Sequence, residues 1–287
     1  MRFAAFEVGG QRGLAVEVRG ELRGMLQRDV SFPVALETLI ASGDEALRDA
    51  AMQLERAPLI DPAARLLPPL VRPPKIICIG LNYADHTAET KLDQPQHPTL
   101  FLRTSGSLVA HGQPIVRPYS SEELDFEGEM AAVIGRGGRR ISREQALEHV
   151  FGWSIFNEAT VRDVQFRTQQ WTLGKNFDST GAFGPRLIAA DEVPLGGRGL
   201  RIETRLNGEV VQSANTSDMI FDVAAQIAAI SEAMTLEPGD VLVTGTPAGC
   251  GKWRTPQLWM KHGDVVEVEV EGLGVLTNPV VDEIRPA

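Results

Sequence analysis

The pattern of apolar and polar positions divides the chain into a small N-terminal part and a larger C-terminal part. Over roughly the first 25 residues, short apolar stretches alternate with glycines, which is typical of a small antiparallel meander. Two amphipathic patterns, at 33–41 and 44–54, predict helices. Residues 64–75 contain four prolines and indicate a connector without regular structure. We therefore predict a small α/β domain over residues 1–70 and a larger domain over residues 71–287.

The larger part is predicted to be rich in strands. It begins with a short continuous apolar run, Lys75 to Gly80, that fits a buried strand. Strand patterns outnumber helix patterns and do not alternate with them one for one, which disfavours a regular βαβ layout. The expected fold class is therefore α+β with an excess of strands. The other strand patterns lie at 99–102, 124–134, 152–156, 200–206, 241–244, 264–270 and 275–281, and the helix patterns lie at 83–91, 143–150, 159–167 and 219–234.

Composition and charge narrow the possible functions. The 287 residues include 28 Lys and Arg against 38 Asp and Glu, a formal net charge of −10 at pH 7. Because nucleic acid rewards clustered positive charge, no nucleic-acid partner is expected. No apolar run approaches the roughly 20 residues that span a bilayer, and the first residues lack a signal-peptide pattern, so a cytoplasmic protein without a membrane partner is predicted. The two cysteines, Cys78 and Cys250, have no CxxC neighbour and are predicted to be buried thiols.

The most informative segment covers residues 124–135 and reads Leu-Asp-Phe-Glu-Gly-Glu-Met-Ala-Ala-Val-Ile-Gly. Because side chains alternate along a strand, Glu127 and Glu129 share a face with Ala131 and Val133. This face begins acidic and ends apolar, which places both carboxylates at the end of a buried strand. A divalent cation would relieve their repulsion and their desolvation cost. An edge strand with solvated acids is an equally open alternative.

A second segment, residues 157–165, begins with a residue suited to cap a helix. A helix would place Glu158, Arg162 and Gln165 on one face, at offsets of zero, four and seven residues. These side chains could then contribute to one site. On helix statistics alone, an ordinary surface Glu–Arg pair is the more frequent outcome.

Three further features could serve a reaction. His86 and Glu89 are three residues apart, and on a helix the carboxylate would orient the imidazole and raise its basicity, as a general base requires. Lys175 could offer an ammonium to an anionic substrate. The turn at 244–249 contains glycines that let backbone N–H groups approach a carboxylate. An exposed histidine, a solvated surface lysine and a simple turn are the corresponding alternatives.

Six motifs follow one another between about Lys75 and Pro279, over most of the chain. They are Gly-Leu-Asn-Tyr-x-x-His (80–86), Leu-Asp-Phe-Glu-x-Glu (124–129), Arg-Asp-x-Gln (162–165), Gly-Lys-x-Phe (174–177) with Thr-Gly-Ala-Phe-Gly-Pro (180–185), Leu-Asn-Gly-Glu (206–209) and Thr-Gly-Thr-Pro-x-Gly (244–249). In this order they resemble the fumarylacetoacetate hydrolase superfamily. The resemblance implies a catalytic domain built as a mixed β-sandwich roll, a small variable N-terminal domain and a homodimer.

The resemblance also implies roles for individual residues. Family members bind Mg²⁺ or Mn²⁺ through the two glutamates of the Glu-x-Glu motif, here Glu127 and Glu129. The third ligand is typically an aspartate at the position of Glu158, so this chain departs from the pattern by one methylene. His86 and Glu89 would form a water-activating dyad. The remaining implied roles are Lys175 as a catalytic residue and Arg162, Gln165 and Thr246 as substrate-binding residues.

These roles imply a metal-dependent hydrolase that cleaves a C–C bond of a 2,4-dioxo acid, an acylpyruvate such as fumarylpyruvate or a diketo-deoxy sugar acid, to pyruvate and a carboxylic acid. His86 would activate the water, and the metal and Lys175 would stabilise the departing enolate. Other members use the same enolate-stabilising site on small anionic keto acids, as isomerases of 2-hydroxymuconate-type acids, decarboxylases of oxaloacetate-like acids or dehydratases. The dyad favours hydrolysis, because only hydrolysis strictly needs an activated water. A catalytically silent member is disfavoured, because His86, Glu127 and Glu129 are all present.

Overall fold

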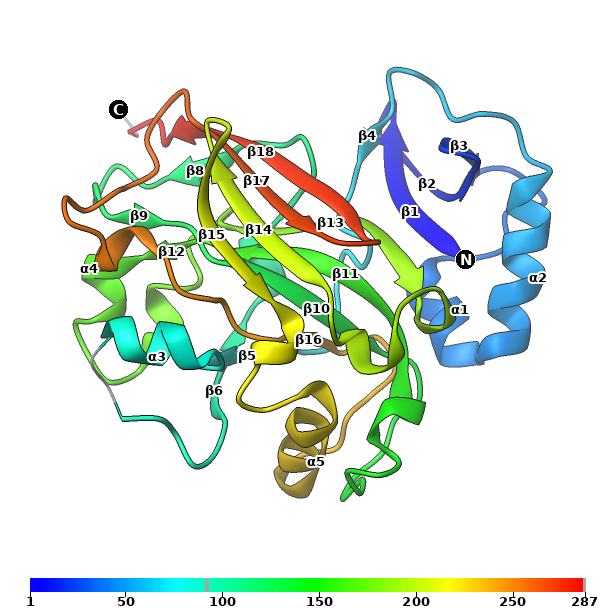
Figure 1. Ribbon diagram of the computed structural model, residues 1–287. Helices are drawn as coiled ribbons and strands as arrows, with labels where there is room; N and C mark the ends of the chain where they lie inside the picture. The colour runs from blue at the N-terminus through cyan, green and yellow to red at the C-terminus, as the bar shows by residue number, and fades with distance from the viewer. Residues whose placement is uncertain (91–92, 286–287) are drawn as a thin grey trace.

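The computed structural model describes residues 1–90 and 93–285, and strands dominate it (Figure 1). The larger sheet has eleven strands. Two of them lie off its main path, since β4 (Arg65–Leu66) pairs only with β1 (Arg2–Val8) and β7 (Leu108–Ala110) pairs only with β13 (Gly181–Ala189). The main path runs in the order β3 (Glu21–Leu26), β2 (Gln11–Val18), β1, β13, β11 (Val150–Glu158), β10 (Gly128–Ile134), β16 (Val241–Val243), β5 (Ile76–Gly80) and β6 (Thr99–Arg103).

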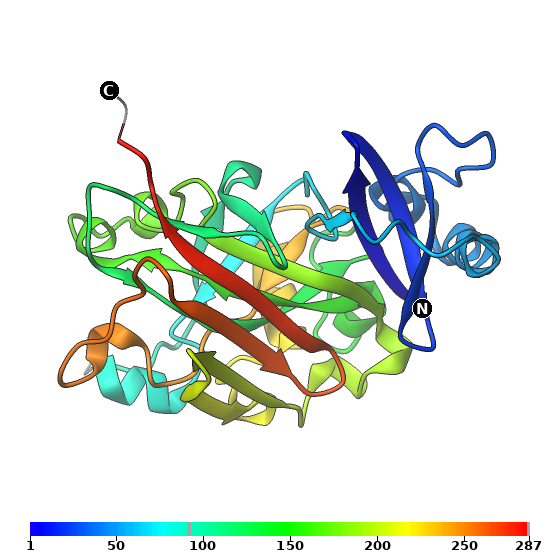
Figure 2. The same ribbon diagram turned by 90° about the horizontal axis from the view of Figure 1, so that it is seen from above.

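A second sheet of five strands packs against the larger one (Figures 1 and 2). Its order is β15 (Glu209–Asn215), β14 (Arg201–Leu206), β17 (Val265–Val270), β18 (Gly274–Asp282) and β8 (Ile115–Arg117). Alternate apolar residues of both sheets form the core between them, as expected for face-to-face packing. Among the buried residues of this core are Met130, Ala132 and Ile134 from β10 and Val266, Val268 and Val270 from β17. The predicted fold class, a strand-rich α+β fold with mixed sheets, is confirmed.

Strand β10 is buried on both faces. It pairs antiparallel with β11 on one side and with β16 on the other. Ala131 and Val133 face a second core, which also contains residues of the N-terminal strands and of helices α1 (Leu36–Ser42) and α2 (Asp44–Glu55). A strand that is apolar on both faces and paired on both edges is central in its sheet. The buried-strand interpretation of this segment is therefore confirmed, and the edge-strand alternative is wrong.

Sheet pairing overrides two of the predicted helices. In place of a helix at 143–150, a 3₁₀ turn at Ala146–His149 leads directly into β11. In place of a helix over 159–167, strand β12 (Thr160–Val161) pairs with β9 (Leu124–Asp125), and only the short helix α4 (Arg162–Gln165) follows. Strand β11 pairs with a neighbouring strand on each side, and β12 pairs with β9. This pairing outweighs the local sequence pattern that favours a helix.

The other predicted helices are present with shifted ends. Besides α1 and α2, the described residues contain α3 (Ala84–Thr90) and α5 (Val223–Ala233) where helices were expected. Lys91, the predicted last residue of the helix at 83–91, lies outside the described residues. Strands β13 and β15 were not predicted, because glycines and polar residues interrupt their apolar pattern.

The predicted N-terminal meander corresponds to β1, β2 and β3. Strand β1 also pairs with β13, so the large sheet is continuous between the N-terminal strands and the rest of the chain. The division into residues 1–70 and 71–287 stays a prediction.

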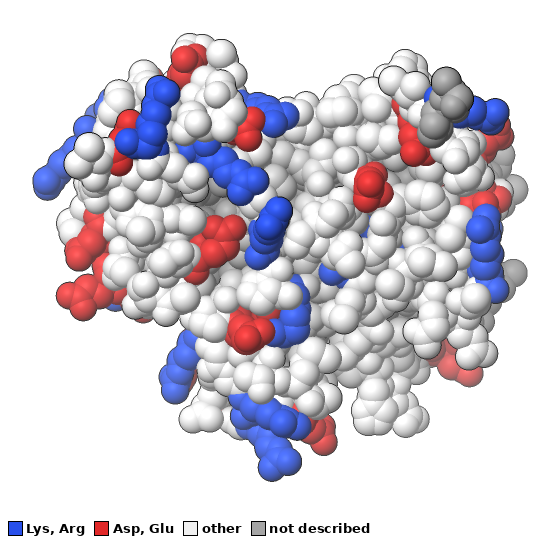
Figure 3. Space-filling view, turned by 180° about the vertical axis from the view of Figure 1, so that it is seen from behind, with Lys and Arg blue, Asp and Glu red and all other residues white. Residues whose placement is uncertain are grey.

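Cys78 and Cys250 are both buried and form no disulfide bond, as predicted. Within residues 1–90 and 93–285, no helix is long and apolar enough to cross a membrane. On the face drawn in Figure 3, acidic and basic side chains are interspersed, and a broad area between them carries no charged side chain.

Candidate active site

Eight of the nine predicted site residues line a single cavity of about 150 Å³. The ninth, Glu89, contacts His86 rather than the cavity. The cavity lies between the ends of central strands, helices α3 and α4, and the loop that follows β16. Its polar lining consists of His86, Thr90, Glu127, Glu129, Glu158, Arg162, Gln165, Lys175 and Thr246, and its apolar lining includes Ile79, Leu81, Phe101, Phe166, Trp171 and Trp253.

Three carboxylates converge where β10 begins and β11 ends. The register pairs Gly128 with Asn157, so Glu127 lies beside Glu158, whose backbone N–H donates to the Glu127 carbonyl at 2.8 Å. One oxygen each of Glu127, Glu129 and Glu158 lie within 4.8 Å of one another, and all three residues are buried. Glu158 is the last residue of a strand, so its predicted position on the helix of Arg162 and Gln165 is wrong.

Gly128 separates the two glutamates of the motif, and the second sheet packs directly on its backbone. A Cβ atom there would lie 2.1 Å from Oγ1 of Thr204 and 3.0 Å from Cγ1 of Val268. Since Glu127 and Glu129 point away from that sheet, a side chain between them would push the sheets apart and displace both carboxylates. The Glu-x-Glu spacing therefore works here only with glycine in the middle.

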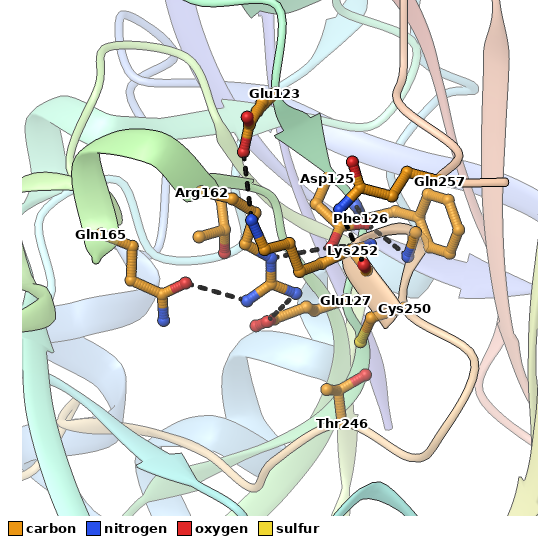
Figure 4. A network of polar contacts seen from close by, with 12 residues as sticks. Glu123, Asp125, Phe126, Glu127, Arg162, Gln165, Thr246, Cys250, Lys252 and Gln257 are labelled. Atoms are coloured by element: carbon orange, nitrogen blue, oxygen red, sulfur yellow. Dashed lines mark hydrogen bonds and ion pairs between the residues drawn. The ribbon is translucent and has the colours of Figure 1, made fainter. Parts of the chain in front are cut away.

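Three buried cations compensate part of this negative charge. Lys175 Nζ donates to Glu127 Oε2 at 2.5 Å and to Glu158 Oε2 at 3.1 Å. Arg162 Nη2 lies 2.6 Å from Glu127 Oε1, and its Nε donates to Asp125 Oδ2 at 2.7 Å (Figure 4). Arg103 Nε lies 3.4 Å from Glu158 Oε1.

Glu129 differs from its two neighbours in its partners. Among the described residues, Lys and Arg side chains pair with Glu127 and Glu158 but not with Glu129. Its Oε2 accepts the backbone N–H of Gly245 at 2.5 Å. Glu129 is thus a buried carboxylate that forms no ion pair with a described lysine or arginine, and an unpaired charge of this kind is costly to bury.

The pKa values of the two motif glutamates shift in opposite directions. Burial raises the pKa of Glu129 well above its ordinary value, and the negative charges of Glu158 and Glu127 raise it further. Burial also acts to raise the pKa of Glu127, but the charges of Arg162 and Lys175 outweigh it and lower that pKa to about 2. Burial acts to lower the pKa of Lys175, yet Glu127 and Glu158 raise it overall, so its ammonium stays charged.

The donor set of this cluster fits a hard divalent cation. Mg²⁺ and Mn²⁺ prefer oxygen ligands, and the three carboxylates bring one oxygen each within 4.8 Å. A cation here would balance the charge of Glu129 and engage Glu158 Oε1, a buried oxygen without a hydrogen-bond donor among the described residues. Glu158 therefore reaches the cluster despite the methylene by which it exceeds aspartate.

His86 and Glu89 form the predicted pair on helix α3. His86 Nδ1 lies 2.7 Å from Glu89 Oε1, and Glu89 Oε2 accepts the backbone N–H of Gly249 at 3.0 Å. When Nδ1 donates its proton to the carboxylate, Nε2 carries the free lone pair, as a base requires. Gly249 has φ +105°, and a Cβ atom there would lie 2.2 Å from the carbonyl oxygen of Val211, so only glycine fits.

The predicted substrate-binding residues already have protein partners. Arg162 Nη1 donates to Gln165 Oε1 at 3.0 Å, which leaves the Gln165 Nε2 group for another partner. Thr246 Oγ1 donates to the Gly128 carbonyl at 3.1 Å and accepts from Gln212 Nε2 at 2.8 Å. Both side chains are therefore fixed by residues of the cluster or its neighbours.

Sequence reasoning missed several residues that support the site. Asp125 belongs to a quoted motif but was given no role, although it binds Arg162 and accepts the backbone N–H groups of Gly251 and Lys252. Gln212 accepts the backbone N–H of Gly128 at 2.9 Å. Arg103, at the end of β6, donates to the carbonyl of Ala159 as well as facing Glu158. Arg103 and Gln212 lie far in sequence from their partners, and no local pattern marks them.

Comparison with known proteins identifies the family. Residues 75–281 match the family described as fumarylacetoacetate (FAA) hydrolase, C-terminal. The solved structure of a fumarylacetoacetate hydrolase from Exiguobacterium antarcticum superposes with a TM-score of 0.86 at 36% identity, covering 99% of this chain and all of that chain. A maleylpyruvate hydrolase from Sphingobium, solved with manganese(II) and pyruvate, gives a TM-score of 0.81 at 29% identity, with coverage of 99% and 100%.

Relatives named as oxaloacetate tautomerases overturn the predicted activity. A mitochondrial oxaloacetate tautomerase of Xenopus laevis is 39% identical over 273 residues, which cover 94% of this chain and 85% of the relative. Relatives from Rattus norvegicus, Homo sapiens and Bacillus subtilis are 37–42% identical, cover 75–96% of this chain and 73–88% of their own length, and are also oxaloacetate tautomerases. The prediction of an acylpyruvate hydrolase is therefore wrong.

The reason for this error lies in the dyad. His86 and Glu89 were taken to favour hydrolysis because hydrolysis needs an activated water. Removal of a proton from carbon needs a positioned base just as much, and it needs no water. The alternative drawn from the same site, an isomerase or decarboxylase of 2-hydroxymuconate-type or oxaloacetate-like acids, agrees better with the relatives.

Proposed function

The chain belongs to the fumarylacetoacetate hydrolase family, and on this premise we propose that it is a divalent-metal-dependent tautomerase that interconverts the keto and enol forms of oxaloacetate. One observation carries the proposal: a histidine base and a buried three-carboxylate cluster line the same small cavity. This combination suits the transfer of a proton next to a carbonyl group whose oxygen becomes negatively charged. The names of these relatives support the choice of substrate.

In the proposed reaction no carbon–carbon bond breaks. A base removes a proton from the carbon next to the 2-oxo group, the electron pair moves to the carbonyl oxygen, and that oxygen then receives a proton. The enol returns to the keto form by the reverse steps. We assign the proton on carbon to His86 Nε2, because Nδ1 is held by Glu89 at 2.7 Å. Glu89 then stabilises the imidazolium that forms when Nε2 accepts the proton.

We assign Glu127, Glu129 and Glu158 as the residues that would hold Mg²⁺ or Mn²⁺. When bound, the cation supplies positive charge that stabilises the enolate and helps to orient the 2-oxo acid. The backbone N–H of Gly245 fixes the Glu129 carboxylate, and Lys175 and Arg162 fix that of Glu127. The chain therefore holds these ligands in place before any cation arrives, which lowers the cost of binding.

Lys175 is proposed to hold the proton that the carbonyl oxygen receives. Two of its three N–H groups are directed to Glu127 and Glu158, which leaves one for an oxygen of the substrate. Its raised pKa keeps the ammonium charged, so it stabilises the enolate oxygen as negative charge develops.

The remaining polar lining is proposed to bind the carboxylates of the diacid. The Nε, Nη1 and Nη2 atoms of Arg162 contact Asp125, Gln165 and Glu127, in that order. Arg162 therefore positions these three side chains. Gln165 Nε2 and the turn that contains Thr246 remain to receive the substrate. The apolar lining from Phe101, Phe166 and the tryptophans excludes water, which would otherwise compete for the enolate.

The test is the rate of ketonisation. Oxaloacetate kept as its enol in an aprotic solvent is diluted into buffer that contains Mg²⁺ or Mn²⁺, and the loss of enol absorbance in the ultraviolet is followed with and without protein. We expect acceleration over the metal-containing buffer, abolished by a chelator. Product analysis by NMR should show no pyruvate from the enzyme. No acceleration, or enzyme-dependent release of carbon dioxide, would contradict the proposal.

Two predictions from the sequence lie outside this proposal. The homodimer and the cytoplasmic location stay predictions, and the Xenopus relative is itself a mitochondrial protein.

A further inference from the structure

A second cluster of metal-binding side chains lies beside the carboxylates. One ring nitrogen of His86, one carboxylate oxygen of Glu89 and the sulfur of Cys250 all lie within 4.8 Å of one another. His86 and Cys250 are buried, and Glu89 is partly buried. His86 and Glu89 come from helix α3, whereas Cys250 comes from the loop after β16. The fold therefore brings nitrogen, oxygen and sulfur ligands from two distant segments to one point.

Hydrogen bonds from the same loop and from Gln212 of strand β15 fix this second cluster. Glu89 Oε2 accepts the N–H of Gly249, the residue directly before Cys250, at 3.0 Å. Gln212 Nε2 lies 3.7 Å from Cys250 Sγ and also donates to Thr246 Oγ1. The thiol is therefore held next to the dyad by the turn that follows β16, and a small displacement would suffice to close the three ligands on an ion.

The two clusters differ in the ions that they prefer. Glu127, Glu129 and Glu158 offer only oxygen, which suits Mg²⁺ and Mn²⁺, whereas His86, Glu89 and Cys250 offer nitrogen, oxygen and sulfur, which suit Zn²⁺. In a tetrahedral zinc site, bonds of about 2.0–2.3 Å place ligand atoms about 3.3–3.8 Å apart. Ligand atoms within 4.8 Å need to move by roughly 1 Å or less to reach that arrangement.

We propose that His86, Glu89 and Cys250 form a second cation site, selective for Zn²⁺ and similar thiophilic ions, and that its occupation inhibits the enzyme. The thiol of Cys250 loses its proton to solvent when the ion binds, and no electron is transferred. An ion on His86 Nε2 blocks the base directly. An ion on Nδ1 leaves the ring proton on Nε2, which then cannot accept a proton from the substrate.

The inhibition rests on the proposed function, but the existence of the site does not. Occupation by Co²⁺ therefore tests the site without any activity measurement. Chelator-stripped protein is first loaded with excess Mg²⁺ and then titrated with Co²⁺, and the near-ultraviolet charge-transfer band of a cobalt-bound thiolate is recorded. We expect this band in the wild-type protein, its loss in Cys250→Ser, and its displacement by Zn²⁺.

Cys78→Ser is the matched control, because Cys78 is the other buried thiol and lies on strand β5. The band should persist in this variant. Absence of the band in the wild-type protein, its survival in Cys250→Ser or its loss in Cys78→Ser would overturn the proposed site.

Inhibition is measured separately, as the Zn²⁺ concentration that halves each variant's own zinc-free tautomerase rate in excess Mg²⁺. In Cys250→Ser this concentration should rise at least about tenfold, because the thiolate is the ligand that Zn²⁺ favours most over Mg²⁺. If the wild-type protein shows the cobalt band but Zn²⁺ inhibits wild type and Cys250→Ser equally, the inhibitory role is refuted. A wild-type protein without tautomerase activity would refute the proposed function, while the cobalt band would still decide the site.

Discussion

The carboxylates of Glu127, Glu129 and Glu158 are fixed by two central strands, whereas His86 and Glu89 lie on a helix of seven residues that follows β5. The first group depends on strand register and on cations from distant segments. The second depends on a spacing of three residues, on the hydrogen bond of 2.7 Å between His86 and Glu89, and on the backbone N–H that Gly249 donates to Glu89. In the proposed mechanism the sheet holds charge in place, and the helix carries the group that gains and loses a proton.

The two regions should therefore fail differently when altered. Removal of a carboxylate changes the electrostatic balance of a buried network, so both cation binding and stability respond. Removal of the imidazole changes proton transfer but leaves that network intact. Each of the following predictions tests this difference.

The largest effect is expected for Glu129→Gln. This variant removes a proposed ligand charge without leaving a lysine or arginine unpaired, so the protein should fold normally. Loss of the cation costs several kcal/mol of enolate stabilisation, more than about 10³-fold in rate. Calorimetric titration with Mn²⁺ should show weakened binding in parallel with lost activity. Tight Mn²⁺ binding in this variant would exclude Glu129 as a ligand.

His86→Ala should lower turnover by about 10²–10⁴-fold, the usual contribution of a general base. Mn²⁺ affinity should stay within about twofold of wild type, because the imidazole does not belong to the carboxylate cluster. Steady-state ketonisation and the same titration measure both quantities on one preparation. A variant with unchanged turnover would remove His86 from the mechanism.

Glu127→Ala should destabilise the metal-free protein by roughly 3 kcal/mol, because it leaves Lys175 and Arg162 short of one carboxylate each in a buried environment. This loss of unfolding free energy lies near the lower end of the range for a broken buried ion pair, because Lys175 still pairs with Glu158 and Arg162 still pairs with Asp125. Urea denaturation in the presence of a chelator measures it. Glu129→Gln is the matched control and should not destabilise the protein. If both variants lost the same free energy of unfolding, the pairing of Lys175 and Arg162 with Glu127 rather than Glu129 would be contradicted.

The smallest effect, taken per pH unit, is a dependence of stability on pH. The folded pKa of Glu129 lies above its ordinary value of 4.5, so above this pH the metal-free folded protein retains a proton that the unfolded chain releases. Its stability should therefore fall as pH rises from 4.5, by at most about 1.4 kcal/mol per pH unit. Glu127, with a pKa of about 2, acts in the opposite direction and loses its stabilising effect as pH falls from 4.5 to 2.

Denaturation of wild type and Glu129→Gln with a chelator, at several values between pH 5 and pH 8, isolates the contribution of Glu129. The stability difference between the two proteins should grow with pH. Parallel profiles would show that Glu129 is not the titrating group.

Sequence patterns predicted the parts of the site that are formed by residues close together in the chain. The pair of His86 and Glu89 follows from a spacing of one helical turn, and the structure contains it. The alternation at 127–133 placed both glutamates on one face of a buried strand, and the burial of Ala131 and Val133 agrees with it. These features need only the periodicity of a helix or a strand.

The rest depends on contacts between distant segments. Glu158 was expected on a helix because its capping pattern is local, while the partners that extend β11 through this residue lie in β10 and β13. Arg103 and Gln212 reach the site only through sheet pairing and through the second sheet. The activity was also beyond prediction, because hydrolysis and tautomerisation require the same base and the same charge stabilisation.

The loop after β16 contacts both regions, since the Gly245 N–H binds Glu129 and the Gly249 N–H binds Glu89. This shared support constrains how the enzyme can be redesigned. Substitutions in the loop would alter ion retention and base orientation together, so attempts to change which acid is accepted should leave it untouched. Phe166 is a better position for directed evolution, because its exposed side chain lines the cavity and lies outside that loop.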